Sequence, residues 1–328
     1  MQPLRGPAGL PEHLLISPDG ELNLVPFAAL IDEQGRYLVQ QHTISYLTSG
    51  GDLLRLHVRR ESKGPAVVIA DPAFGEPALI ANETRAKNKG LPRRAAVDYS
   101  RPFFGPLPGV ADEVRTLREL IPQASFLTKE QATKAALEKL KGPFILHIAT
   151  HGFFLAEPPP AVLANVATTS TSAARGATES SSASRTVSSV ADNPLLRSGL
   201  ALAGANQSND GILTALEASG LNLWGTKLVV LSACDTGVGE VRNGEGVYGL
   251  RRALVLAGAE SQMMSLWPVS DRSTRDLIAG YYKALLSGAG RSEALRETQL
   301  RILKLKPHPY YWASFIQAGE WANLEGKR

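Results

Sequence analysis

Two reactive side chains directly follow two apolar segments of the sequence. Cys234 follows residues 227–233, and His151 comes two positions after residues 144–149. A thiolate is a strong nucleophile, and an imidazole beside it can stabilise the thiolate or take the proton of the thiol. If the two segments are neighbouring strands, the pair has the makings of a Cys-His dyad. Gly152 permits close backbone approach, so its N–H and that of Cys234 are candidates to hold the oxyanion of a tetrahedral intermediate.

Each of these residues also has a structural interpretation. A lone cysteine such as Cys234 is more often a buried hydrophobic residue than a nucleophile, and His151 can serve as a capping or hydrogen-bonded histidine. His147 lies inside its predicted strand, which favours a packing role. The glycine-rich segment 237–246 lacks the Gly-Lys-Ser/Thr ending of a phosphate-binding loop. Glu240 occupies the position at which a cysteine phosphatase carries arginine, and no Gly-x-Ser-x-Gly motif indicates a serine hydrolase.

Composition narrows the class of protein further. The chain has 328 residues and one cysteine, which excludes an internal disulfide framework and any zinc site built from several cysteines. A net charge of +4 is too small to indicate nucleic acid or an anionic membrane as a partner. Residues 1–20 lack a signal-peptide core, and no apolar stretch approaches the ~18 residues of a membrane span. We therefore expect a soluble cytoplasmic protein that needs no metal or cofactor.

The alternation of strand and helix patterns predicts an α/β fold with a mainly parallel sheet. Thr128, followed by Gln131, has the pattern of a capping box and predicts a helix over residues 129–141. In an open parallel sheet, ligands bind at the edge formed by the carboxyl ends of the strands, which would bring His151 and Cys234 to one crevice. Strands are expected at 66–70, 125–127, 144–149, 227–233 and 261–266, and further helices at 110–121, 247–257, 273–286 and 292–305.

Two regions differ from this alternating pattern. Residues 11–60 are strand-like and rich in turn signals such as Pro-Asp-Gly at 18–20, and the apolar runs at 22–25 and 36–39 read as strands. Residues from about 158 to 191 are mostly Ser, Thr, Ala and Pro. Such a segment has too little apolar surface to bury, so we expect a disordered insertion within the α/β region.

Several motifs resemble those of CHAT domains, the caspase-like peptidases related to separase. The two most informative are Leu-His-Ile-Ala-Thr-His-Gly at 146–152 and Leu-Ser-Ala-Cys-Asp-Thr-Gly at 231–237. Because separate motifs occur in the right order over most of the chain, the resemblance is specific. The other matching segments are 16–20, 25–27, 193–200, 243–246, 265–271 and 308–312.

This resemblance implies a caspase-hemoglobinase fold of clan CD type, with a mainly parallel sheet between helices in an α/β/α sandwich. It implies that His151 is the general base or imidazolium partner and that Cys234 is the nucleophile. Gly152 and Cys234 match the oxyanion-hole positions. Asp271 resembles the separase acid that recognises a basic side chain before the scissile bond, although an N-capping role is the alternative. Ser232 stands where metacaspases carry an acidic substrate-binding residue.

The resemblance also implies a function, a cysteine endopeptidase that cleaves a protein or peptide substrate. We divide the chain into an N-terminal part, 1–60, and a catalytic domain, 61–328. CHAT domains commonly follow tetratricopeptide or other repeats that sense a partner, so we expect that such a sensor is either absent or a tetratricopeptide-repeat or other partner on another polypeptide. The alternatives are a catalytically silent CHAT scaffold or signalling adaptor, and a nucleotide-dependent switch that uses residues 237–246. The presence of both His151 and Cys234 favours the peptidase.

Overall fold

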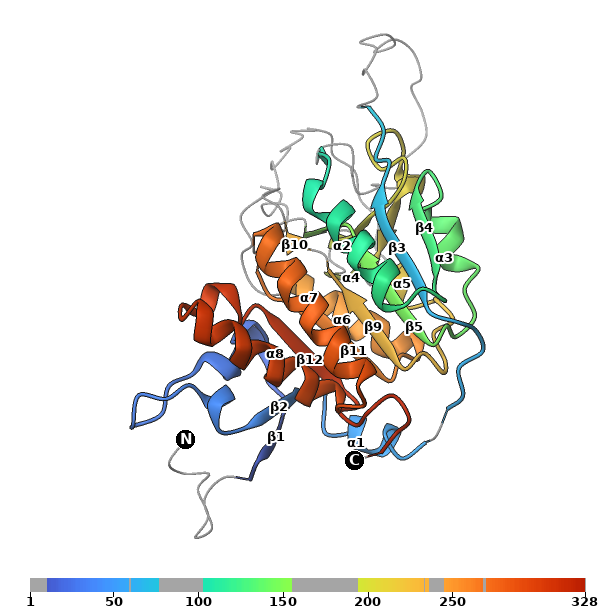
Figure 1. The fold of residues 1–328 in the computed structure, drawn as a ribbon. Coiled ribbons are helices and arrows are strands. Elements are labelled where there is room, and N and C mark those ends of the chain that lie inside the picture. The colour runs from blue at the N-terminus through green and yellow to red at the C-terminus, as the bar shows by residue number, and fades with distance from the viewer. Residues whose placement is uncertain are drawn as a thin grey trace, which may run out of the picture.

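The chain forms two β-sheets, one of eight strands and one of four (Figure 1). The computed structural model describes residues 11–58, 60–76, 103–154, 194–232, 234–235, 245–267 and 270–327. The large sheet has the order β1-β2-β12-β11-β9-β5-β3-β4, and every neighbouring pair in it is parallel except β11 and β12. Its strands are β1 (His13–Ile16), β2 (Thr43–Tyr46), β3 (Val67–Pro72), β4 (Ser125–Lys129), β5 (Ile145–Ala149), β9 (Leu228–Leu231), β11 (Ser261–Ser265) and β12 (Phe315–Gly319).

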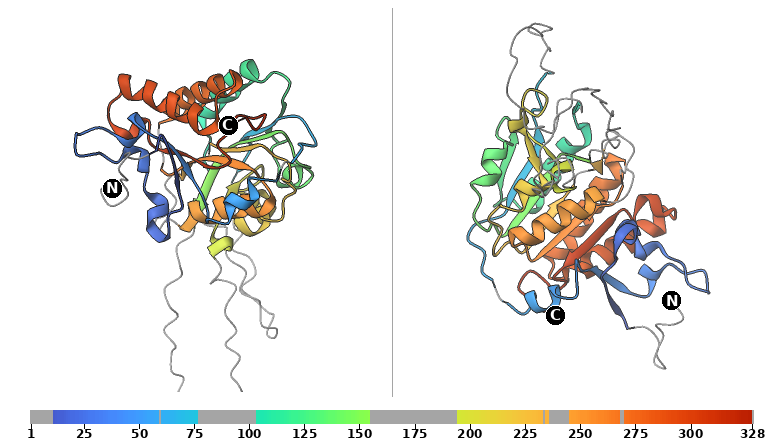
Figure 2. Two further views of the ribbon diagram at one scale, coloured as in Figure 1. Left: turned by 90° about the horizontal axis from the view of Figure 1, so that it is seen from below. Right: turned by 180° about the vertical axis from the view of Figure 1, so that it is seen from behind.

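Helices cover both faces of the large sheet, as Figure 2 shows in its left-hand view. The helices α2, α7 and α8 lie on one face and pack against one another in that order, whereas α6 lies on the other face. The expected layers of helix, mainly parallel sheet and helix are therefore confirmed. The helices are α1 (Asp52–Arg55), α2 (Pro108–Leu120), α3 (Lys134–Glu138), α4 (Pro194–Arg197), α5 (Ala215–Ala218), α6 (Glu245–Ala257), α7 (Asp271–Leu286) and α8 (Arg291–Leu305).

The central strands of the large sheet are buried on both faces. Every residue of β5 and β9 is buried, which is the environment that their continuous apolar sequences indicate. The two strands are neighbours with parallel register, in which His147 pairs with Val230. The expected adjacency of these two strands is therefore confirmed.

The second sheet has the order β10-β6-β7-β8 and stands at the carboxyl end of β5 and β9. Its strands follow directly from the large sheet, because β6 begins two residues after β5 ends and β10 begins three residues after β9 ends. Its strands are β6 (His151–Phe154), β7 (Ser198–Ala201), β8 (Ile212–Thr214) and β10 (Cys234–Asp235).

The helix expected over residues 129–141 is wrong in its start and its length. The strand β4 continues to Lys129, and the following helix α3 covers only Lys134–Glu138. Thr128 pairs with Ala70 of β3 in the parallel ladder, so tertiary pairing overrides its local capping pattern. The helix is capped instead by Thr133, whose side chain accepts a hydrogen bond from Ala136 N–H at 3.1 Å.

The N-terminal region contains less strand than its sequence suggests. Residues 22–25 lie largely in a 3-10 helix (Gly20–Leu24), and residues 36–39 give one isolated bridge and the start of another 3-10 helix (Leu38–Gln40). The strand β2 pairs with β12, so this region extends the large sheet. The insertion expected at about 158–191 lies outside the described residues. In the described part of the chain, no helix has the length and apolar character needed to cross a membrane.

Candidate functional site

The backbone positions of His151 and Cys234 lie side by side in the small sheet. Strands β6 and β10 are parallel neighbours, and their register pairs Cys234 with His151 and Asp235 with Gly152. This arrangement arises because β5 and β9, already neighbours, both leave the large sheet at their carboxyl ends and enter the second sheet together. The structure thus brings together the three residues that the sequence singled out, and their catalytic and oxyanion-binding roles stay a prediction.

The imidazole of His151 is buried against a backbone carbonyl and two aromatic rings. Its exposed fraction is 6%. Its Nε2 lies 2.8 Å from the carbonyl oxygen of Gly105. Because a carbonyl oxygen only accepts, Nε2 carries the hydrogen, and in the neutral ring Nδ1 carries the lone pair. The rings of Phe74 and Phe104 lie with centroids 5.2 and 5.8 Å from the imidazole.

Two influences act on the protonation of His151. Burial lowers its pKa below the ordinary histidine value, and the hydrogen bond to the Gly105 carbonyl partly opposes this effect by stabilising the imidazolium. Since the net shift is downward, the neutral form dominates at pH 7. A neutral imidazole with a fixed Nε2–H has the protonation state and the tautomer that a general base requires.

A buried polar network lies beneath this site. Ser232 donates a hydrogen bond from its hydroxyl to Oε2 of Glu113 at 2.9 Å, and Oε1 of Glu113 lies 2.9 Å from Nε2 of His147. The hydroxyl of Tyr282 lies 3.1 Å from the other ring nitrogen of His147. Burial, and after it the charges of Tyr281 and Glu113, raise the pKa of Tyr282 well above its usual value. The network joins α2 and α7 to the middle of β5 through His147 and to the carboxyl end of β9 through Ser232, in keeping with a packing role for His147.

The two expected substrate-binding residues occupy different surroundings. Ser232 is 6% exposed, with its hydroxyl on Glu113. Asp271 is the first residue of α7, and Ser270 holds the N-cap position, so the alternative of Asp271 as the N-cap is wrong by one residue. The strand β11, which precedes α7, is the parallel neighbour of β9, so Asp271 follows the same edge of the sheet as Cys234. Substrate binding by Ser232 and Asp271 stays a prediction.

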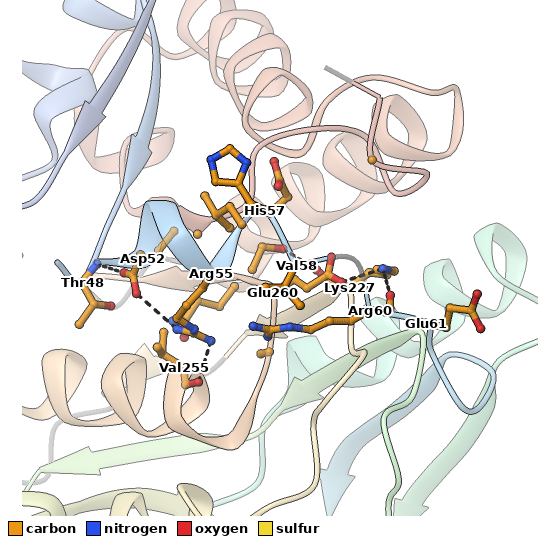
Figure 3. A pocket seen from close by; sticks show the side chains of 18 of the residues that line it. Thr48, Asp52, Arg55, His57, Val58, Arg60, Glu61, Lys227, Val255 and Glu260 are labelled. Atoms are coloured by element: carbon orange, nitrogen blue, oxygen red, sulfur yellow. Dashed lines mark hydrogen bonds and ion pairs between the residues drawn. The ribbon is translucent and has the colours of Figure 1, made fainter. Parts of the chain in front are cut away.

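A separate cavity of about 520 Å³ lies at the opposite, amino-terminal edge of the sheet (Figure 3). Lys227, which directly precedes β9, is one of its lining residues. Charged groups here pair with one another: Asp52 lies 3.3 Å from Arg55, and Lys227 lies 2.7 Å from Glu260. Because it lies at the opposite edge of the sheet, the cavity is distinct from the site at His151. No group of three or more potential metal ligands occurs among the residues that the structure describes.

Several contributors to the site carry no motif in the sequence. Gly105, Phe74 and Phe104 reach His151 from segments in which the sequence predicted neither a strand nor a helix. Glu113 is a helix residue whose burial at 3% exposure is unusual for a carboxylate. The sequence feature that could have indicated the burial of Glu113 is its position on the apolar face of the helix, one residue before Val114.

Comparison with known proteins gives three results. A sequence model described as the CHAT domain matches residues 1–320. Tetratricopeptide repeat protein 28 of Mus musculus is 27% identical over 336 residues, and the Homo sapiens protein of the same name is 26% identical over 328 residues. Each match covers 97% of this chain, which spans only 12% of the length of those relatives.

The third result concerns solved structures. The Arg-specific cysteine proteinase gingipain R aligns with a TM-score of 0.44 and 8% identity, covering 90% of this chain and 57% of that one. The Saccharomyces cerevisiae separase–securin complex aligns with a TM-score of 0.42 and 11% identity, covering 90% of this chain and 14% of that one.

Proposed function

Because the chain belongs to the CHAT domain family, we propose that it is a cysteine endopeptidase with Cys234 as nucleophile and His151 as proton carrier. The observation that carries this proposal is the register of β6 and β10, which pairs the two residues directly. Residues paired across neighbouring strands share a face of the sheet at a spacing of about 4.8 Å. That spacing suits proton exchange between a thiol and an imidazole.

The proposed reaction begins with transfer of the thiol proton of Cys234 to Nδ1 of His151. The thiolate attacks the peptide carbonyl, and the N–H groups of Gly152 and Cys234 stabilise the oxyanion. As the intermediate collapses, the imidazolium gives its proton to the leaving amine, and a thioester remains. Water, deprotonated by His151, then hydrolyses the thioester and restores the thiol. Throughout, the Gly105 carbonyl holds Nε2 and thereby the orientation of the ring.

The proposal also covers the substrate specificity of the peptidase and the control of its activity. Asp271, at the start of α7, is proposed to recognise a basic side chain before the scissile bond, with Ser232 as a further contributor. The two relatives are named for tetratricopeptide repeats, and this chain matches a small part of each. We therefore extend the proposal to control of the peptidase by a tetratricopeptide-type partner or segment.

The direct test is cleavage of a peptide library followed by mass spectrometry. Wild type is expected to cleave, whereas Cys234→Ala and His151→Ala are expected to lose at least about a thousandfold in rate. The matched control is His57→Ala, which removes an exposed histidine at the opposite edge of the sheet and should cleave as wild type. Cleavage that survives Cys234→Ala contradicts the mechanism.

A second measurement does not depend on finding a substrate. Since Cys234 is the only cysteine in the chain, iodoacetamide adds one mass increment that reports on this thiol alone. At pH 7 the wild type should react faster than His151→Ala, because the imidazole stabilises the thiolate. No cleavage together with equal alkylation rates would favour the alternative function, a catalytically silent CHAT scaffold.

A further inference from the structure

Two segments that flank residues 77–102 converge on His151. The ring of Phe74 contacts the imidazole from the first segment, and the ring of Phe104 and the carbonyl of Gly105 do so from the second. The ring of His151 is therefore positioned by two segments that lie about 30 residues apart in the sequence.

The side chain of Asn206, in the connection between β7 and β8, joins these two segments by hydrogen bonds. Its Oδ1 accepts a hydrogen bond from Phe104 N–H at 2.9 Å. Its Nδ2 donates to the Phe104 carbonyl at 2.9 Å and to the Gly75 carbonyl at 2.8 Å. A primary amide has two N–H donors and one carbonyl acceptor group, so both donors and the acceptor are engaged. The backbone N–H of Asn206 also donates to the Phe74 carbonyl at 2.9 Å.

From this geometry we infer that Asn206 is the positioning residue of His151. By holding both backbone groups of Phe104, Asn206 sets the place of the next residue, Gly105, whose carbonyl fixes the Nε2–H tautomer. Only an amide of this length supplies an acceptor and two donors here, because Asp lacks the donors and Ser has one at most. The expected effect of Asn206 on activity rests on the proposed function, whereas its positioning of the His151 ring does not.

The apolar cluster beside His151 is small, so the place of Gly105 depends on the hydrogen bonds that Asn206 makes to Phe104. The buried cluster beside His151 is small and separate from the main core, and its members are Phe74, Phe104, Phe153, Ala201, Ala205 and Ile212. On its other side, Gly105 leads into α2, which Glu113 ties to His147 and Ser232. Loss of the Asn206 contacts would therefore free the Phe104 side of Gly105 while α2 stays in place.

The test is the tautomer of His151, measured by ¹⁵N NMR of the imidazole nitrogens at neutral pH in the full chain. Wild type should show Nε2–H, with the signals assigned through His151→Gln. Asn206→Asp keeps the acceptor for Phe104 N–H but sets a carboxylate oxygen against the Phe104 and Gly75 carbonyls. The ratio of the Nδ1–H form to the Nε2–H form of His151 should then rise at least about tenfold. The value of kcat/KM should fall about tenfold, with KM little changed.

Asn209→Asp is the matched control, because it makes the same change at an exposed position of the same connection. It should leave the tautomer and the activity as in wild type. If Asn206→Asp does not fold, Asn206→Ala removes the amide without adding charge, and the same rise in Nδ1–H is expected. An unchanged tautomer in a folded Asn206 variant overturns the inference. A shifted tautomer in a protein that cleaves nothing supports the inference while the proposed function fails.

Discussion

His151 shows how the surroundings of a single side chain set its protonation and its tautomer. Burial lowers its pKa, the Gly105 carbonyl opposes that shift, and the downward effect is the larger. The folded-state pKa therefore lies below the unfolded-state value, and the unfolded chain binds more protons in mildly acidic solution. Consequently this residue contributes stability that is complete above the unfolded pKa and is lost as pH falls through the folded pKa.

The pH dependence of stability tests this balance. The free energy of unfolding of wild type should fall relative to that of His151→Gln between pH 7 and pH 5, because only the wild type carries the buried imidazole of His151, whose pKa is lowered. Urea unfolding of both proteins at the two pH values measures the difference. A difference in stability that is the same at both pH values would contradict the assignment of a lowered pKa.

The residues around His151 also explain what the sequence could and could not predict. His151, Gly152 and Cys234 were identifiable because each stands at the end of a strongly apolar segment and within a motif. Their supporting contacts cross large sequence separations: 46 residues from His151 to Gly105, and 102 from Phe104 to Asn206. No local pattern encodes such pairs, because each depends on how whole elements pack.

At the scale of elements, α2 is the helix whose placement matters most to the site. It begins three residues after Gly105, and its Glu113 bonds to His147 in the middle of β5 and to Ser232 directly after β9. The sequence predicted this helix from its apolar spacing, as it did α7 and α8. It mispredicted α3, since the preference of Thr128 for a cap was outweighed by strand pairing with Ala70.

Removal of the Glu113 carboxylate tests this anchoring. Glu113→Ala should lower the free energy of unfolding by about 2–4 kcal/mol, because it leaves the Ser232 hydroxyl and Nε2 of His147 without the buried carboxylate that they contact. Glu119→Ala, on the exposed face of the same helix, should change it by less than about 0.5 kcal/mol. Urea unfolding at pH 7 provides both values, and similar losses for the two variants would show that the buried network adds little.

At the scale of the whole molecule, the N-terminal region is built into the large sheet. The strand β2 pairs with β12, and the buried Tyr46 hydroxyl donates to the Val25 carbonyl and accepts from Phe27 N–H, both at 2.9 Å. On the other side, Ser45 contacts Ser292 of α8. Residues 11–58 thus cover an edge of the sheet and part of α8.

A truncated chain tests whether residues 61–328 fold without the N-terminal region. We expect residues 61–328 to lose cooperative thermal unfolding and to associate, because the deletion exposes the β12 edge and the buried face of α8. Circular dichroism during heating and size-exclusion chromatography are the measurements, with the full chain as reference. A monomeric fragment that unfolds cooperatively would instead establish 61–328 as an independent domain.

The strand that carries Cys234 is only two residues long and lies at the edge of its sheet, with β6 as its neighbour. So short a ladder opens at little free-energy cost, without unfolding the core. Amide hydrogens at Cys234 and Asp235 should therefore exchange with deuterium far faster than those of β9. A substrate or partner that pairs with this edge would slow the exchange, so the exchange rate would report binding beside Cys234.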